Sequence, residues 1–416
     1  MSILFIYILL IFCVSISIKG ILYHNIFAPN TLFSLLWTVM IVTFLYHYNQ
    51  FYEITVKSSL LLLLGSICFF YGSRLMTKRL PRRLSFKKNR PIVLRINMFV
   101  LLSILTIIAL ANNAIVNVKY LMSGMNFNDI QLMNLSGPVG SRDFFITIIT
   151  MLIAMPFVYV VIPILGLELC RPKKRWWVIL LTLLIIFLFV LQGGRRAILI
   201  YIIPSVLYIV IDDLRNYLSK KIKSKLLLII ISLSAIIIYL ISWLSFQRDT
   251  SFKETGYLYL SGGIASFSER IEHIDKFYLG AGTLHGFLAP IMIGVKYLTH
   301  SYPSWWVNLD SLVEAKNEIK IGPAMYMMAF NTMFYIPYID FGVVGVLLIS
   351  LLVGIIYGWA YRRVFSDSNS LNKSVYALLI IGLFGSMYTL YFSQSPYVLS
   401  FIYIYFIFKK KALPTF

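Results

Sequence analysis

Eleven apolar runs, each long enough or nearly long enough to cross a lipid bilayer, constrain this chain more than any other feature. A membrane-spanning helix needs about 20 consecutive apolar residues, so a chain of 416 residues has room for about ten such helices and modest loops. An outer-membrane barrel would show alternating segments of ~10 residues instead of unbroken apolar runs. The runs are residues 2–18, 31–48, 57–76, 92–115, 144–168, 176–193, 197–212, 226–246, 340–361, 374–392 and 395–408.

Composition agrees with the apolar runs and excludes several classes of protein. Hydrophobic residues make up 59% of the chain and charged residues only 13%, whereas soluble domains have about 45–50% and about 25%. This difference excludes a cytosolic enzyme, a disordered protein and a nucleic-acid-binding domain. We therefore predict an all-α polytopic membrane protein of about 11 transmembrane helices, with residues 1–416 forming a single integral membrane domain.

The net charge of +21 is distributed unevenly and predicts an orientation. If every basic cluster faces the cytoplasm, the spans alternate from a periplasmic N-terminus to a cytoplasmic C-terminus, and the whole charge excess lies on the inner side. This is the positive-inside pattern. It favours contact with anionic membrane lipids over nucleic acid as the role of the basic clusters. The clusters lie at residues 74–95, 171–175, 215–225, 362–363 and 409–411.

Two predicted periplasmic loops are long enough to carry function. The first is residues 117–143, and the second is residues 247–338. In the second loop, Ser266 to Glu269 fits a capping box. Apolar residues that follow at helical spacing predict an amphipathic helix at the membrane interface, formed by Phe267, Ile271, Ile274 and Tyr278.

Further along the same loop, residues 286–298 are apolar but too short to span, which favours a re-entrant or interfacial segment. Aromatic residues nearby are typical of interfacial anchors. They are Tyr297, Tyr302, Trp305 and Trp306.

The cysteine and histidine residues do not predict a cofactor. Three cysteines, all in or beside spans, give no disulfide framework and no thiolate metal site. Five histidines lack metal-binding spacing, and His285 and His300 are expected to be polar surface residues. We therefore expect neither a metal nor another cofactor.

Ionisable residues are nearly absent from the predicted spans, although a proton or ion pathway would require them. Asp340, Arg195 and Arg196 fall at outer span ends, and Arg95 and Glu168 at inner ends. This distribution weighs against a proton-coupled transporter and favours binding or chemistry at the outer membrane surface.

The most distinctive local motif is a tight outer turn that carries two glycines and two arginines: Gly193, Gly194, Arg195 and Arg196. Glycine lets a backbone approach a ligand closely, and arginine binds phosphate oxygens bidentately. The arginines could simply reach lipid phosphates from the span ends. Their place on the outer face, against the positive-inside rule, favours a functional role.

Other charged residues of the outer loops could complete such a site. Arg248 and Asp249 follow the eighth span, Glu269, Arg270 and His273 lie on the predicted amphipathic helix, and Arg142 ends the first loop. Together they could cradle a pyrophosphate and orient a hydroxyl nucleophile, with Glu269, His273 or Asp249 as the base. Each residue taken alone could also be a solvated charge on a helix face.

Two motifs resemble those of the Wzy-type O-antigen and capsule repeat-unit polymerases. They are the Gly-Gly-Arg-Arg turn and Asn331-Thr332 followed by Asp340-Phe341-Gly342-Val343-Val344-Gly345, on either side of a large outer loop. The resemblance implies a GT-C-like glycosyltransferase of the bacterial inner membrane that polymerises undecaprenyl-pyrophosphate-linked oligosaccharides on the periplasmic face. It also implies a chain-length regulator and a flippase as partners in the same pathway.

The resemblance also implies roles for individual residues. Arg195, Arg196, Arg248 and Arg270 would bind the donor pyrophosphate and neutralise the leaving group without a divalent metal. In the second motif, Asn331 and Thr332 could instead hold a break before the ninth span. Glycines 342 and 345 would let neighbouring helices approach closely.

Three alternatives can be compared on sequence grounds. An O-antigen ligase would share the layout and differ in its acceptor. A flippase or transporter of lipid-linked oligosaccharide would need charged residues lining a central cavity and short loops on both faces, and the sequence shows neither. A membrane acyltransferase would need a histidine within a span, and all five histidines lie in predicted loops or at span edges.

Overall fold

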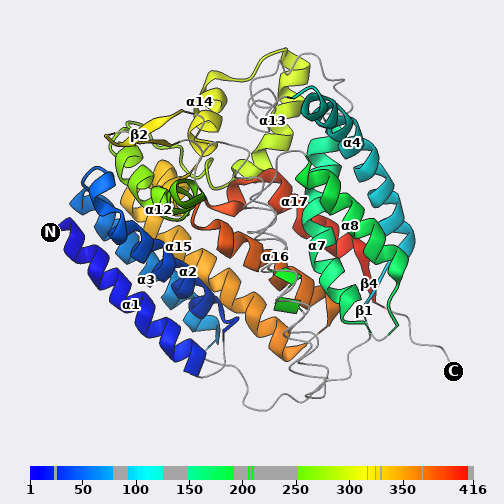
Figure 1. The fold of residues 1–416 in the computed structure, drawn as a ribbon, viewed down its shortest axis with the longest axis horizontal. Helices are drawn as coiled ribbons and strands as arrows, with labels where there is room; N and C mark the ends of the chain where they lie inside the picture. Colours follow the sequence, from blue (N-terminus) through cyan, green and yellow to red (C-terminus); the bar gives the residue numbers. More distant parts are fainter. Residues whose placement is uncertain are drawn as a thin grey trace. The chain divides into compact units, whose positions relative to one another are not determined.

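The structure is a computed structural model that describes most of the chain. The described residues are 1–22, 26–77, 92–124, 148–171, 173–191, 205–206, 208–209, 252–315, 317–323, 325–327, 330–367 and 369–410. Figure 1 shows that these parts are mostly helical, with a few short strands.

The helices and strands have the following bounds. The helices are α1 (Ser2–Leu22), α2 (Pro29–Tyr46), η1 (Tyr48–Gln50), α3 (Val56–Thr77), α4 (Ile96–Met122), the π-helical turn η2 (Thr150–Ala154), α7 (Met155–Leu169), α8 (Trp176–Val190), α12 (Phe252–Ile271), α13 (His285–Thr299), α14 (Ser304–Val313), α15 (Tyr335–Ser366), α16 (Ser370–Gly385), η4 (Tyr391–Ser393) and α17 (Ser395–Ile407). The strands form two antiparallel pairs, β1 (Ile92–Leu94) with β4 (Phe408–Lys410) and β2 (Ile319–Gly322) with β3 (Met325–Met327).

Six of these helices are long and apolar enough to cross a membrane, and they establish the chain as a multi-pass membrane protein. They are α1, α2, α3, α4, the η2–α7 helix and α15, and three shorter apolar helices, α8, α16 and α17, accompany them. All nine coincide with apolar runs of the sequence. Runs 197–212 and 226–246 lie almost entirely outside the described residues, so the total of eleven spans remains a prediction.

The chain divides into two compact units, and both α16 and α17 pass from one unit to the other. The first unit comprises residues 1–87, 253–368 and 382–398. The second comprises residues 88–252, 369–381 and 399–416.

In the first unit, α1 packs against α2 and α3, and α3 packs closely along α15. Glycines make the α3–α15 contact possible. A Cβ atom at Gly72 would collide with the carbonyl oxygen of Leu351, and one at Gly354 would collide with that of Phe69. Close backbone approach at small residues is a recurring way to pack helices in membranes, where hydrophobic burial does not drive association.

Helix α15 contains a kink near its start. Phe341 and Gly342 have non-helical backbone angles, and Gly342 has a φ of 61°, which a side chain would disfavour. The expectation that Gly342 serves helix–helix approach is therefore wrong: it turns the backbone, and the ring of Phe277 lies against it. The freed carbonyl oxygens of Ile339 and Asp340 accept hydrogen bonds from the backbone of Tyr278 and Leu279 (3.1 Å each), as a membrane environment requires.

In the second unit, α4, η2–α7 and α8 pack together. A charged cluster closes the α7–α8 turn, where Arg171 and Arg175 both donate to the buried carboxylate of Glu168.

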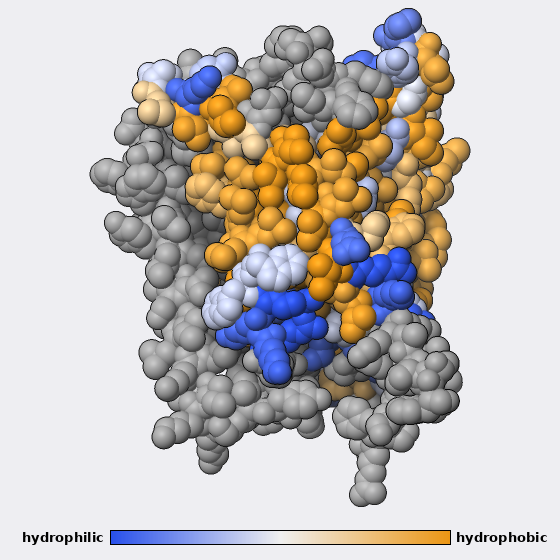
Figure 2. Space-filling view, turned by 90° about the vertical axis from the view of Figure 1, so that its right-hand side faces the viewer, coloured by the Kyte–Doolittle hydropathy of each residue, from blue (hydrophilic) through white to orange (hydrophobic). Residues whose placement is uncertain are grey.

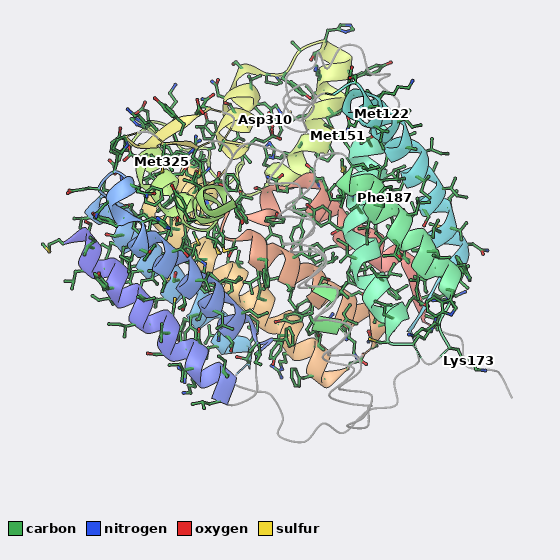
Figure 3. All side chains as sticks on the ribbon, viewed as in Figure 1. Met122, Met151, Lys173, Phe187, Asp310 and Met325 are labelled. Carbon is green, nitrogen blue, oxygen red and sulfur yellow. The ribbon has the colours of Figure 1, made fainter. Side chains whose placement is uncertain are left out.

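On the face drawn in Figure 2, exposed hydrophobic side chains form a band with hydrophilic residues gathered at its two ends. Phe187 of α8, labelled in Figure 3, is among the exposed apolar residues. Such a band matches the surface of a protein embedded in a bilayer.

Candidate functional site

The C-terminal end of α12 carries the described residues that the sequence proposed for acid–base chemistry, but its local structure differs from the expectation. Ser266 lies inside α12, whose last residue is Ile271, so the capping box at Ser266–Glu269 and the amphipathic helix running to Tyr278 are both wrong. The helix begins upstream at Phe252, and the Ser266 hydroxyl donates to the side-chain oxygen of Asn331 (3.0 Å) instead of capping a helix. Ile274 and Tyr278 lie in the non-helical segment that follows.

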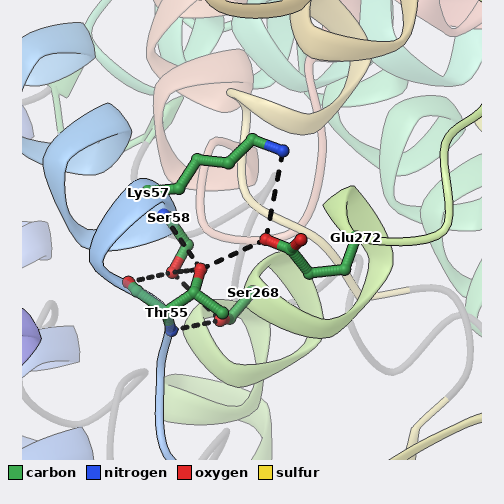
Figure 4. A network of polar contacts seen from close by, with 5 residues as sticks. All are labelled: Thr55, Lys57, Ser58, Ser268 and Glu272. Carbon is green, nitrogen blue, oxygen red and sulfur yellow. Dashed lines mark hydrogen bonds and ion pairs between the residues drawn. The ribbon is translucent and has the colours of Figure 1, made fainter.

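A network of hydroxyl groups fixes the end of α12 against the start of α3 (Figure 4). Thr55 caps α3, because its hydroxyl accepts a hydrogen bond from the backbone of Ser58 (3.2 Å). The Ser268 hydroxyl accepts from the Thr55 backbone (3.0 Å) and from the Ser58 hydroxyl (2.9 Å). The charged residues next to Ser268 are thereby held at a defined position.

Beside this network lie a carboxylate and an amine that remain open to solvent. Glu272 lies 4.0 Å from the amine of Lys57, and both side chains are 44% exposed. The Thr55 hydroxyl donates to Glu272 (3.4 Å), and the Lys57 amine lies 5.2 Å from the centre of the Tyr338 ring. A pair this loose and exposed contributes little to stability. The Lys57 amine, which also has a hydrogen bond with the Tyr338 side chain, is therefore held only at the edge of this network.

Glu269 is the best candidate for a base among the described residues. Partial burial raises the pKa of its carboxyl group above the ordinary value, and the nearby Glu272 raises it further, whereas His273 opposes the shift. His273 itself is exposed. A carboxylate whose pKa is raised accepts a proton more readily, as a general base must. We call Lys57, Glu269, Glu272 and His273 the α12-end site.

Arg270 is buried, unlike the exposed residues Glu272 and His273 that follow it. It is 6% exposed, and its guanidinium donates to the Ser266 hydroxyl (3.2 Å) and to the carbonyl oxygens of Asn317 (2.6 Å) and Met327 (3.4 Å). Burial lowers its pKa, an effect that a hydrogen bond with Tyr335 partly offsets. In this arrangement Arg270 holds the chain around the β2–β3 pair in place.

The second motif of the sequence lies at the kink of α15 and before it. Asp340 is fully buried and accepts hydrogen bonds from the backbone of Gly282 and Thr283 and from the Thr283 hydroxyl (2.6–2.7 Å). Asn331 and Thr332, both buried, immediately precede α15, and the Asn331 backbone donates to the carbonyl oxygen of Tyr388 (2.7 Å). These contacts are those of a motif that holds the backbone in place before α15, which is the structural alternative stated for Asn331 and Thr332 from the sequence.

Several proposed site residues lie outside the described part of the chain. They are Gly193, Gly194, Arg195, Arg196, Arg248 and Asp249, together with Arg142. Their proximity to the α12-end site remains a prediction.

Sequence reasoning missed two features of the first unit. It treated Lys57 only as the first residue of a span, and did not place its amine beside Glu272. It also assigned His285 to the polar surface, yet His285 is 4% exposed and stacks on Trp306 with ring centres 4.6 Å apart. Its ring nitrogens lie 3.0 Å from the Ser393 carbonyl oxygen and 3.0 Å from a carboxylate oxygen of Asp310. Asp310, labelled in Figure 3, belongs to α14.

The buried position of Trp306, which is 3% exposed, also corrects its assignment as an interfacial anchor, whereas Trp305 is 44% exposed.

Within the ranges that the structure describes, no three His, Cys, Asp or Glu side chains gather closely enough to hold a metal ion. Compared with protein-family models, with curated proteins and with solved structures, the chain matches none of them.

Proposed function

We propose that this protein is a membrane glycosyltransferase that polymerises undecaprenyl-pyrophosphate-linked oligosaccharide repeat units into O-antigen or capsular polysaccharide. The observation that carries the proposal is the α12-end site. There a carboxyl group with a raised pKa, a histidine and an exposed amine gather where the end of α12 meets the start of the apolar helix α3. The Gly-Gly-Arg-Arg turn and the Asn331–Gly345 motif add the resemblance to Wzy-type polymerases.

The chemistry requires a base, a site for the leaving group and an acceptor hydroxyl. The hydroxyl oxygen of an incoming repeat unit attacks the anomeric carbon of the growing chain, and a new glycosidic C–O bond forms. The C–O bond to the lipid pyrophosphate breaks, and its electron pair leaves with the pyrophosphate. Glu269 accepts the hydroxyl proton, and its raised pKa favours this transfer.

Cations stabilise the charge that develops on the pyrophosphate. In the proposal, Arg195, Arg196 and Arg248 supply most of this stabilisation, and Lys57 adds a cation beside the base. Because Arg270 has its guanidinium on carbonyl oxygens, its part in the proposal is to position the site. The reaction would take place on the periplasmic face of a bacterial inner membrane, with a flippase and a chain-length regulator as partners.

The first test is a gel of surface polysaccharide from a strain that lacks the gene. Loss of the ladder with a single repeat unit left on the core supports a polymerase. Loss of all repeat units, with polymer accumulating on the lipid carrier, identifies an O-antigen ligase instead. An unchanged gel contradicts both enzyme functions and favours the transporter alternative.

The second test assigns the base. Lipid-linked repeat units extracted from the deletion strain are supplied to purified protein in nanodiscs, and polymer is measured over time. We expect Glu269→Gln to lower the polymerisation rate by about 100-fold or more. Glu272→Gln is the matched control, since it removes a carboxylate of the same site that pairs only loosely with Lys57. A wild-type rate from Glu269→Gln would remove Glu269 from the reaction.

A third test concerns the Gly-Gly-Arg-Arg turn. Arg195→Ala combined with Arg196→Ala is expected to abolish long polymer while the protein stays in the membrane. A normal ladder from this double variant would contradict pyrophosphate binding by the turn.

A further inference from the structure

The segment between α12 and α13 is fixed to the kink of α15 by an unusually complete set of hydrogen bonds. Its backbone at Tyr278 and Leu279 donates to the two carbonyl oxygens that the kink frees. The buried carboxylate of Asp340 then accepts three further bonds from Gly282 and Thr283. A buried carboxylate that is fully hydrogen-bonded makes a rigid anchor. The loop of residues 277–284 therefore has a defined shape.

That rigid loop presents apolar side chains to the outside. Leu279 is 79% exposed and has a φ of 50°, a left-handed conformation that is uncommon for a residue other than glycine. Phe277 is 52% exposed. Strained backbone persists where surrounding contacts impose it, often at functional positions. Two exposed apolar side chains on one rigid loop begin an apolar surface.

Helix α13 continues the apolar surface. Leu284, Phe287, Ile291 and Leu298 recur at helical spacing and are 51%, 51%, 60% and 80% exposed. At 1.5 Å per residue, the 15 residues of α13 span about 22 Å, less than the ~30 Å hydrocarbon core of a bilayer. Near its C-terminus, the Lys296 amine lies 4.9 Å from the centre of the Tyr302 ring. This combination of an apolar face with aromatic and basic residues at one end is typical of a helix at a membrane interface.

The surface is also continuous with a face that must contact lipid. From the kink onward, Phe341, Val344, Leu348 and Leu352 of the membrane-spanning α15 are 43–58% exposed. The loop touches the first turn of this face, because a Cβ atom at Gly280 would lie 3.4 Å from the Phe341 ring.

We propose that residues 277–298 form a lipid-inserted elbow, in which the rigid 277–284 loop and the apolar face of α13 are buried in one leaflet of the bilayer. Asp340 is the positioning residue that holds the elbow at the kink of α15. The partner is the lipid surface itself, and the inference does not depend on the proposed transferase activity.

The test places a nitroxide label at single positions of the full-length protein in nanodiscs of phosphatidylethanolamine and phosphatidylglycerol. Cys13, Cys68 and Cys170 are first replaced by alanine. Labels are then introduced through Leu279→Cys and Ile291→Cys, and oxygen and a water-soluble nickel chelate serve as relaxing agents. Val344→Cys provides the lipid-facing control, and Glu318→Cys, an exposed residue of the loop before β2, provides the aqueous control.

We expect the labels at Leu279 and Ile291 to behave like the label at Val344, with an oxygen-to-nickel accessibility ratio at least several-fold above that at Glu318. Nickel accessibility equal to that at Glu318 would show that the elbow faces water. Protection from both agents would show that protein covers it. Either result overturns the proposal. If Leu279→Cys does not fold, Phe287→Cys takes its place.

The anchoring role has a separate readout. Asp340→Asn preserves the size of the side chain but removes the charge and one acceptor oxygen. We expect the spectrum of a label at Leu279 to narrow, since the loop gains motion, while the spectrum at Val344 stays the same. An unchanged spectrum at Leu279 would contradict the role of Asp340.

Discussion

Two histidines of the first unit, each close to a carboxylate, differ in what surrounds them. His273 is exposed and lies beside Glu269 at the end of α12. His285 is buried, with its ring stacked on Trp306 and both ring nitrogens within 3.0 Å of acceptor oxygens. The first pair is open to a ligand, whereas the second has its hydrogen-bonding capacity filled by the protein.

The contrast separates residues that can take part in a reaction from residues that hold the fold together. The His285 ring joins three segments, since its partners come from α14 and from η4 while it opens α13. Its contribution should therefore appear as stability. Substitutions in the α12-end site should instead change activity and its pH dependence. Its exposed groups, such as the loosely paired Lys57 and Glu272, can contact a ligand without first breaking strong contacts within the protein.

The largest expected effect comes from His285→Ala. Loss of a buried stacked ring and of its polar contacts with the Ser393 carbonyl and the Asp310 carboxylate should lower the free energy of unfolding by about 3 kcal/mol. Thermal unfolding in detergent, followed by tryptophan fluorescence, measures the change. The exposed His273→Ala is the matched control and should change stability by no more than about 0.5 kcal/mol. Equal unfolding temperatures for the two variants would contradict the distinction.

A smaller effect concerns the pH dependence of stability. The raised pKa of Glu269 means that the folded protein holds this proton more tightly than the unfolded chain. Its stabilising contribution is thus present below the ordinary pKa of 4.5 and is lost as the pH rises through the folded-state value. We expect Glu269→Gln, which cannot ionise, to gain about 2 °C or less in unfolding temperature relative to the wild type between pH 4 and pH 8.

The Glu272→Gln variant serves as the comparison in the same series. If the unfolding temperature of Glu269→Gln rose relative to the wild type as the pH fell, the prediction would be contradicted. That result would show that folding stabilises the charged form of the Glu269 carboxyl group.

The smallest effect should come from the loose ion pair. A double-mutant cycle of Lys57→Ala and Glu272→Ala should give a coupling energy of about 0.2–1 kcal/mol, since both side chains are 44% exposed and 4.0 Å apart. The coupling should fall further in 1 M salt, where the Debye length is about 3 Å. A coupling above about 2 kcal/mol would place Lys57 and Glu272 in a closed cluster, like the one around Glu168.

Much of the fold follows from hydropathy, because a bilayer imposes one solution on a long apolar run. All nine apolar helices of the described chain coincide with runs visible in the sequence. The kink of α15 could not be located in this way. Asp340 and Gly342 are unusual in an apolar run, but the backbone of residues 278–283, which satisfies the kink, comes from a segment far away in sequence.

The candidate site was predictable only where it depends on local spacing. Glu269 and His273 are close together, as their separation of four residues suggested, even though the helix ends at Ile271. The nearness of Lys57 was not predictable, since it depends on the hydroxyl contacts between Thr55, Ser58 and Ser268. Nothing in the spacing of His285 indicated that Asp310 and Ser393 would meet it.

The close contact between α3 and α15 has a consequence for how the chain reaches its native state. More than half of the sequence separates Gly72 from Gly354, and membrane insertion proceeds from the N-terminus. During synthesis, α3 must therefore wait in the bilayer with its glycine surface against lipid until α15 emerges. A ribosome-stalled chain that ends before α15 should be recognised and degraded by membrane quality control, and one that includes α15 should escape.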